Sequence, residues 1–166
     1  MFCIEIKRLY WIKETEDYPN DLCLHGDVVI NLCNKRSEES CCASAAALYL
    51  LKAIEEDHIP KSGNQLFPCC GHFIIANEHL DKVEILGCNN GLDWSIIHKN
   101  DIVNFVTESN TAEHMHIEDY KTVVFNFADA IEKYYLNCTQ KNIPQDKFEK
   151  DGYIAFWNEW HKRRLA

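Results

Sequence analysis

Glycine is scarce in this chain: six of the 166 residues. The sequence contains neither the G-x-x-x-x-G-K phosphate loop nor the G-x-G-x-x-G dinucleotide fingerprint, and the G-x-S-x-G nucleophile elbow is also missing. No segment approaches the ~20 consecutive apolar residues that cross a bilayer. The first residues, MFCIEIK, lack the basic and apolar regions of a signal peptide. We therefore expect that the protein is neither an enzyme with a phosphate-binding loop nor a membrane protein. We expect a cytoplasmic location.

Cysteine and histidine are plentiful, with nine and eight residues, but they lack metal-site spacing. No pair has the C-x-x-C or H-x₃-H separation that builds zinc sites and redox pairs. An odd number of cysteines also fits poorly with a complete set of disulfides. The thiols are therefore interpreted as small apolar fillers in a reducing compartment, and we expect no metal and no cofactor.

Basic residues are outnumbered, 17 against 26 acidic ones, which gives a net charge of −9. Direct binding to nucleic acid is disfavoured, because it needs a basic face. A cationic protein partner is favoured, although an acidic surface can also serve solubility alone. The hydrophobic fraction of 46% predicts a well-formed core, and the length fits one domain over residues 1–166.

The periodicity of the sequence predicts an α+β fold, a mostly antiparallel sheet packed by about three helices. Strands are expected near residues 2–12, 22–33, 73–76, 83–88, 92–97 and 102–107, with a weaker one at 114–117. The Asn89-Asn90-Gly91 run between two apolar segments predicts a hairpin turn.

Helices are predicted near residues 38–56, 117–138 and 151–164. The first begins at Ser37 as a capping residue and is apolar on nearly every side. The second carries an apolar stripe at alternating spacings of three and four residues, from Ile117 to Cys138. The third places Tyr153, Phe156, Trp157 and Trp160 on one face, which we expect to be core more often than a binding surface.

The densest cluster of reactive side chains lies at residues 68–72, with the sequence PCCGH. Cys69 or Cys70 is a candidate nucleophile, or a zinc ligand together with His72, Cys88 or His98. The alternative, which we favour, is a structural turn that leads into a buried strand.

Two further pairs of residues contain histidine. Asp21 and His25 would share one face of a strand, but four residues of extended chain separate them by about 13 Å, too far for direct contact. His114 and His116 would also share a strand face, as many metal pairs do, but no third ligand is identifiable.

Two acidic clusters are the candidate docking surface for a basic partner. The first cluster is Glu14, Glu16 and Asp17, and the second is Glu55, Glu56 and Asp57. Acidic clusters of this type are usually solvated faces.

Five segments together resemble one family. They are residues 21–26 (DLCLHG), 44–51 (SAAALYLL), 68–72 (PCCGH), 87–94 (GCNNGLDW) and 156–164 (FWNEWHKRR). They are similar to small bacterial proteins associated with immunity in contact-dependent growth inhibition and related toxin systems. The similarity spans about residues 20–164.

This resemblance implies a cytoplasmic antidote rather than an enzyme. Such a protein binds a cognate toxin, commonly a nuclease, and occludes its cationic cleft. The alternatives are a small Cys/His- or zinc-dependent enzyme and a regulatory protein-binding module. A cysteine and a histidine held in bonding geometry at the floor of a pocket would favour the enzyme.

Overall fold

The N-terminal part of the protein is a three-stranded antiparallel sheet in the order β1-β2-β3. The structure of the protein is a computed structural model, which describes residues 1–69 and 73–165. The strands are β1 (Cys3–Tyr10), β2 (His25–Leu32) and β3 (Lys35–Cys42). The central strand β2 is the most buried of the three, as its Val-Val-Ile run predicts.

A two-residue turn joins β2 to β3. Cys33 and Asn34 both have positive φ angles, 52° and 59°, which is the backbone of a type I′ hairpin turn. Leu32 pairs with Lys35 beside the turn, and the ladder continues without a bulge to the pair of His25 and Cys42. This turn therefore sets which residues of the two strands face each other.

The predicted start of the first helix at Ser37 is wrong, because residues 35–42 form β3. In this segment Glu38 pairs with Val29 and Ser37 with Ile30. Pairing to a strongly β-forming strand outweighs the local helix-start pattern, since strand preference depends on the neighbouring strand. The helix α1 (Ala43–Lys52) begins only after Cys42 and ends four residues before the predicted end at 56.

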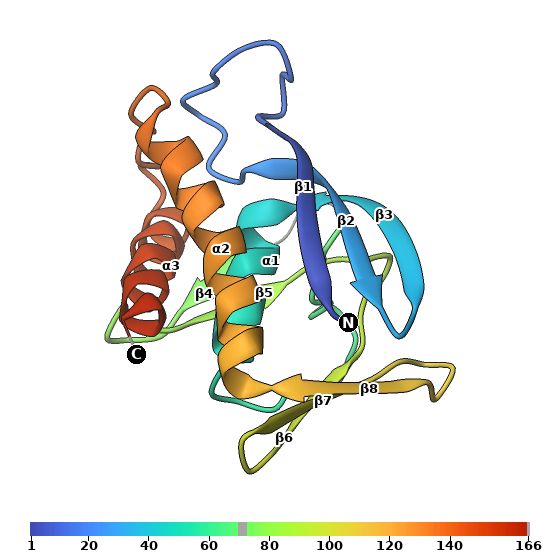
Figure 1. Ribbon diagram of the computed structural model, residues 1–166. Coiled ribbons are helices and arrows are strands. Elements are labelled where there is room, and N and C mark those ends of the chain that lie inside the picture. The colour runs from blue at the N-terminus through green and yellow to red at the C-terminus, as the bar shows by residue number, and fades with distance from the viewer. Residues whose placement is uncertain (70–72, 166) are drawn as a thin grey trace.

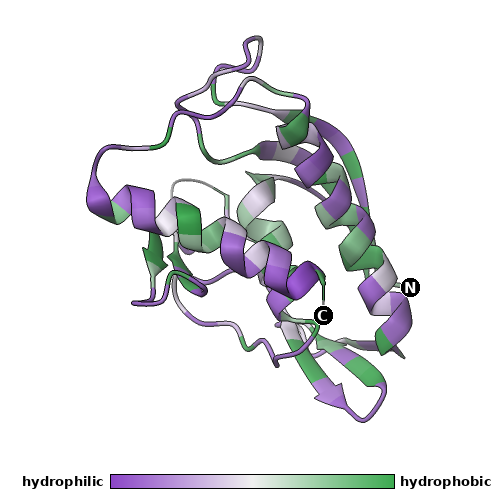
Figure 2. Ribbon diagram, turned by 90° about the vertical axis from the view of Figure 1, so that its left-hand side faces the viewer, coloured by the Kyte–Doolittle hydropathy of each residue, from purple (hydrophilic) through white to green (hydrophobic). Residues whose placement is uncertain are grey.

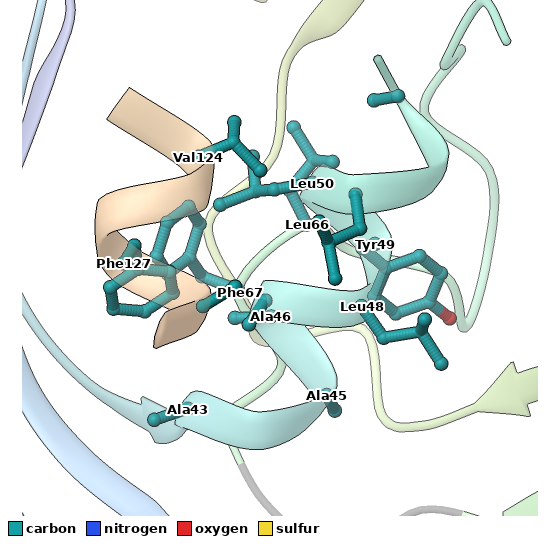
Figure 3. Packing of buried hydrophobic residues seen from close by; sticks show 14 of the residues in the cluster. Ala43, Ala45, Ala46, Leu48, Tyr49, Leu50, Leu66, Phe67, Val124 and Phe127 are labelled. Carbon is teal, nitrogen blue, oxygen red and sulfur yellow. The ribbon is translucent and has the colours of Figure 1, made fainter. Parts of the chain in front are cut away.

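Helix α1 lies at the centre of the hydrophobic core, and nine of its ten residues are buried. Alanines at four of its positions let neighbouring elements approach closely. Figure 3 shows Leu50 and Ala46 of this helix beside Val124 and Phe127 of α2 (Ile117–Leu136). The elements therefore share one core that is built around this short helix.

The remaining strands form two smaller antiparallel sheets. One pairs β4 (Phe73–Ala76) with β5 (Val83–Leu86), and the other has the order β6-β7-β8, from β6 (Ser95–Lys99), β7 (Ile102–Val106) and β8 (Ala112–His116). The predicted hairpin at residues 89–91 is wrong, because β5 pairs with β4 and β6 pairs with β7.

Gly91 serves a close approach rather than a hairpin turn. A Cβ atom at this position would lie 2.4 Å from the carbonyl oxygen of Phe67. The neighbouring residue Leu92 pairs with Phe67 in an isolated bridge. The segment after β5 therefore packs directly on the segment that precedes β4.

Two long helices cover the core. Helix α2 buries Tyr120, Val124, Phe127 and Ile131, so its predicted stripe is confirmed. The third helix, α3 (Lys147–Arg164), buries Phe156 and Trp160, whereas Tyr153 and Trp157 are half-buried. Figure 1 shows α2 in front of α1, with α3 to its left, and in Figure 2 both long helices carry alternating hydrophobic and hydrophilic bands.

The predicted α+β class is confirmed. The described residues contain three helices and eight strands, and the strands form three small antiparallel sheets. In the part of the chain that the structure describes, no helix combines the length and the apolar character needed to cross a bilayer.

Candidate functional site

Asp21, His25 and Cys42 meet at the wall of one cavity of about 440 Å³. The cavity lies where the loop before β2, the β3–α1 junction, β4 and α3 come together. The sequence predicted no contact between Asp21 and His25, and this prediction is wrong. His25 Nε2 lies 3.5 Å from Asp21 Oδ2, because residues 21–24 precede the strand and the chain bends at Cys23.

His25 and Cys42 face each other across the β2–β3 ladder. Their side chains interact, and this interaction contributes to the raised pKa of the imidazole. On the other side of β2, Tyr10 pairs with His25 and its ring stacks on the imidazole at a centroid distance of 5.8 Å. The imidazole is therefore held between Tyr10 and Cys42, and Asp21 contacts it from the preceding loop.

Two backbone groups fix the carboxylate of Asp21. The Ile12 N–H donates to Oδ2 at 2.6 Å, and the Cys23 N–H donates to Oδ1 at 3.1 Å. Burial opposes the charged form of Asp21, but the hydrogen bonds from His25 and these two N–H groups outweigh it and lower the pKa of Asp21. The residue that contacts His25 is therefore a charged and oriented acceptor.

The same contacts raise the pKa of His25 to about 9. The hydrogen bond to Asp21 contributes most, followed by the hydrogen bond to Cys42, and together they exceed the opposing effect of burial. An imidazolium beside a thiol favours the thiolate, which is the reactive form of cysteine. The three side chains thus form a chain of interactions that can hold and move a proton.

Cys42 stands at the N-cap position of α1, where the helix dipole favours negative charge, and its side chain makes no capping hydrogen bond. Only 1% of its surface is exposed, so a reactant reaches it through the cavity. The preceding residue, Cys41, differs: burial raises its pKa above the ordinary thiol value. The two adjacent cysteines therefore provide a candidate nucleophile and an inert neighbour.

The loop that carries Asp21 is fastened to the helices. The Tyr135 hydroxyl of α2 donates to the Leu22 carbonyl at 2.8 Å. The Leu24 N–H donates to both the Ser44 hydroxyl and the Tyr135 hydroxyl at 3.1 Å, and the Ser44 N–H returns a bond to the Leu24 carbonyl. These contacts fix the segment between Asp21 and His25.

The predicted Cys/His cluster is only partly described. Cys70 and His72 lie outside the described residues. The sulfur atoms of Cys69 and Cys88 lie 3.0 Å apart, whereas His98 donates its backbone N–H to Asp57 and places Nδ1 2.9 Å from the same carboxylate. Across residues 1–69 and 73–165, no group of three or more His, Cys, Asp or Glu side chains has the arrangement of a metal site.

His114 and His116 both lie on β8 with exposed side chains. His116 is the N-cap of α2, and its Nδ1 accepts the N–H of Glu118 at 3.3 Å. The structure therefore gives one member of this pair a capping role.

Each of the six acidic candidates for partner binding has a basic neighbour in its own chain. In the first cluster, Glu14 contacts Arg8, Glu16 contacts Lys13 and Asp17 contacts Lys141. In the second cluster, Arg163 contacts both Glu55 and Glu56, at 2.9 and 2.5 Å, and His98 contacts Asp57. These ion pairs offset part of the charge that a basic partner would meet.

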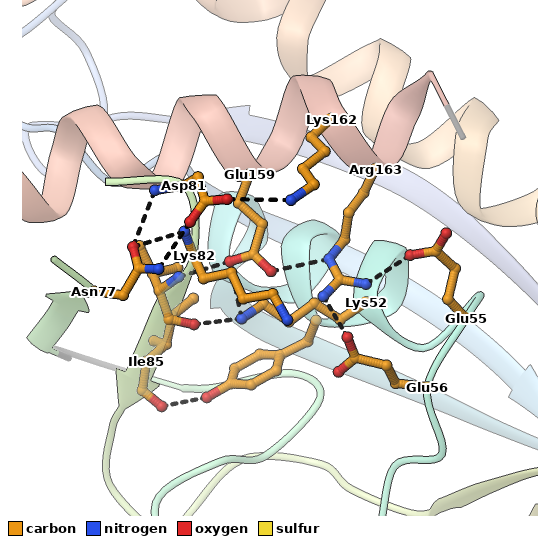
Figure 4. A network of polar contacts seen from close by, with 12 residues as sticks. Lys52, Glu55, Glu56, Asn77, Asp81, Lys82, Ile85, Glu159, Lys162 and Arg163 are labelled. Atoms are coloured by element: carbon orange, nitrogen blue, oxygen red, sulfur yellow. Dashed lines mark hydrogen bonds and ion pairs between the residues drawn. The ribbon is translucent and has the colours of Figure 1, made fainter. Parts of the chain in front are cut away.

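Arg163 also belongs to a buried network around Glu159 (Figure 4). Glu159 is 1% exposed, and its carboxylate contacts Arg163 Nε at 2.9 Å, Lys52 Nζ at 3.1 Å and the Val83 N–H at 2.7 Å. Burial opposes the charge on Arg163, but hydrogen bonds to Glu56 and Glu159 outweigh it and raise the pKa of Arg163. All these groups hold α3 to α1 and β5, which is a structural role.

Sequence reasoning missed His25 and Cys42 as a pair because it placed residues 38–42 in a helix. One signal could have found the pair. Once the two-residue turn at Cys33 and Asn34 is recognised, seven steps outward along each strand bring His25 opposite Cys42.

A comparison of the chain with protein-family models, curated proteins and solved structures found no match.

Proposed function

We propose that the protein is a cysteine-dependent acyl-transfer enzyme. Cys42 acts as the nucleophile, His25 as the general base and acid, and Asp21 as the residue that orients His25. The observation that carries this proposal is the chain of contacts from Asp21 through His25 to Cys42 at the wall of a cavity. Such triads are recognised by geometry and roles rather than by their order in the sequence.

In the first half of the reaction, the Cys42 thiolate attacks the carbonyl carbon of an ester, thioester or amide. A carbon–sulfur bond forms, the bond between the carbonyl carbon and the leaving group breaks, and the imidazolium of His25 gives its proton to the leaving group. In the second half, His25 takes a proton from water as the water oxygen attacks the acyl-enzyme. The carboxylic acid leaves and the thiolate and imidazolium are restored.

The side chains around the pair support these roles. Tyr10 and Asp21 restrict rotation of the imidazole, so His25 presents a fixed nitrogen to Cys42. The start of α1 favours the thiolate before the substrate binds. Together these features prepare the nucleophile at neutral pH, which the sequence alone did not suggest for Cys42.

The test is acylation by p-nitrophenyl acetate, followed by peptide mass spectrometry. The proposal predicts an early burst of p-nitrophenol and an acetyl group on Cys42. The burst is lost in Cys42→Ser and retained in Cys41→Ser, which is matched in position and burial. Acetylation that spares Cys42, or equal loss of the burst in both variants, would contradict the proposal.

A second candidate function is the neutralisation of a basic toxin, and the net charge of −9 favours it. The acidic surface would occupy the cationic cleft of a nuclease domain and accelerate association. Its test is co-purification with a toxin domain encoded next to the gene for this chain, with affinity that falls as salt increases. A genomic neighbour that encodes no such domain counts against it.

A further inference from the structure

The cavity beside Cys42 has an apolar mouth. Three of the large hydrophobic side chains most exposed to solvent line it: Ile12 at 64%, Phe73 at 68% and Phe148 at 48% exposure. They come from the loop after β1, from β4 and from α3. Exposed apolar groups that gather from three elements around one opening mark a binding site for an apolar ligand.

Less exposed side chains continue this apolar character. The same cavity is also lined by Leu22, Ile74, Pro144, Tyr153 and Phe156, which are less exposed than the three residues at the mouth and which we call the inner wall. Ile74 is held close to α3 because Gly152 lacks a side chain: a Cβ there would lie 2.3 Å from the Ile74 carbonyl oxygen. The packing of α3 on β4 therefore shapes this wall.

Charge at the cavity selects against anions. Among the residues that the structure describes, the charged ones lining it are Asp21, His25 and Glu149. The imidazole of His25 is already paired with Asp21 and Cys42. An anionic group deep in the cavity would meet two carboxylates and no unpaired cation among these lining residues, and its burial would be costly.

We infer that the substrate of Cys42 carries a neutral, apolar acyl group of medium length that fills the cavity between Ile12, Phe73 and Phe148. This inference rests on the proposed acyl-transfer function. The apolar chain lies along the inner wall and brings its carbonyl carbon to the sulfur. Remote apolar binding of this kind increases reactivity by positioning the reacting carbonyl.

The kinetic test compares p-nitrophenyl acetate, p-nitrophenyl hexanoate and the p-nitrophenyl monoester of succinate. We expect kcat/KM for hexanoate to exceed that for acetate at least tenfold, because each buried methylene is worth about 0.8 kcal/mol, or roughly fourfold in rate. The succinate monoester should be no better than acetate. Equal values for acetate and hexanoate overturn the inference and leave the proposed function standing.

Variants locate the effect. Ile12→Ser and Phe148→Ser should each remove most of the preference for hexanoate over acetate. Ile59→Ser is the matched control, because Ile59 is 65% exposed but does not line this cavity. A preference that survives both mouth substitutions, or falls equally in the control, would overturn the assignment.

A binding measurement separates this inference from the proposed function. Hexanamide, a neutral amide that is not a reactive ester, is titrated into the Cys42→Ser protein and followed by NMR. Shifts at Phe148 and Tyr153 that saturate with hexanamide but not with acetamide support the apolar site even if no ester reacts. Absence of saturable shifts overturns the inference independently of catalysis.

Discussion

His25 and Cys42 occupy directly opposed positions in the β2–β3 ladder, and the interaction between their side chains contributes to the raised pKa of His25. The pair stands where β3 passes into α1, so one partner is held by a sheet and the other by a sheet and a helix terminus. Rigid elements on both sides fix the distance between an imidazole and a thiol better than loops would.

Stability should depend on pH through His25. Its pKa in the folded protein is about 9, above the ordinary value of 6.5. Its charged form therefore stabilises the fold fully below about pH 6.5, and this contribution is lost as the pH rises toward 9. The free energy of unfolding of the wild type should exceed that of His25→Gln by on the order of 2 kcal/mol at pH 6, and by less at pH 9.

Urea unfolding of both proteins at several pH values measures this difference. His79→Gln is the control, because His79 is an exposed residue outside the cavity. A difference between the wild type and His25→Gln that does not change with pH would contradict the charged state of His25.

Asp21→Asn should lower the pKa of His25, because the hydrogen bond to Asp21 is the largest contribution that raises it. The change removes the negative charge and keeps the shape of the side chain. NMR titration of the imidazole protons measures the pKa directly. Asp27→Asn is the control, since Asp27 binds Ser40 and Arg8 instead; an equal fall in both variants would argue against a specific role for Asp21.

Cys69 and Cys88 should form a disulfide under mild oxidation, because their sulfur atoms lie 3.0 Å apart. With copper–phenanthroline as the oxidant, two thiols lose two hydrogens and the protein mass falls by about 2 Da. Mapping of tryptic peptides identifies the linked residues. A linkage that pairs exposed Cys3 with another thiol instead, or stoichiometric zinc that protects Cys69 and Cys88, would contradict this expectation.

Arg163→Met should lower the free energy of unfolding by about 3 kcal/mol, because it leaves Glu159 buried with fewer cationic partners. Lys162→Met, at the next position, removes only an exposed pair with Asp81 and should cost less than about 1 kcal/mol. Denaturant unfolding compares the two. Equal costs would mean that the network around Glu159 adds little to stability.

The sequence predicted those elements whose pattern is local. The apolar stripe of α2 sets both its helical form and its buried face, so Val124 and Phe127 could be placed in the core. The segment 37–42 was misassigned because its helix-like start is local, whereas its pairing to β2 is not. The run at residues 89–91 resembles a hairpin turn, but Gly91 is needed for contact with Phe67.

The candidate site was beyond sequence reasoning for the same reason. Asp21 and His25 are four residues apart, and only a bent chain lets them touch. The contact between His25 and Cys42 depends on strand register, which the turn at Cys33 and Asn34 sets. A residue's chemistry can be read from its type, but its partner is set by pairing between distant segments.

The most direct test of the catalytic pair is the rate at which iodoacetamide alkylates Cys42 at pH 6, measured by peptide mass spectrometry. We expect Cys42 to be alkylated faster than glutathione under the same conditions, at a rate that falls at least tenfold in His25→Gln, whereas Cys41 is alkylated slowly in both proteins. If Cys42 reacts as slowly as Cys41, and if its rate is the same in His25→Gln, the Cys42 thiol is an inert core residue and the proposed catalytic activity is contradicted.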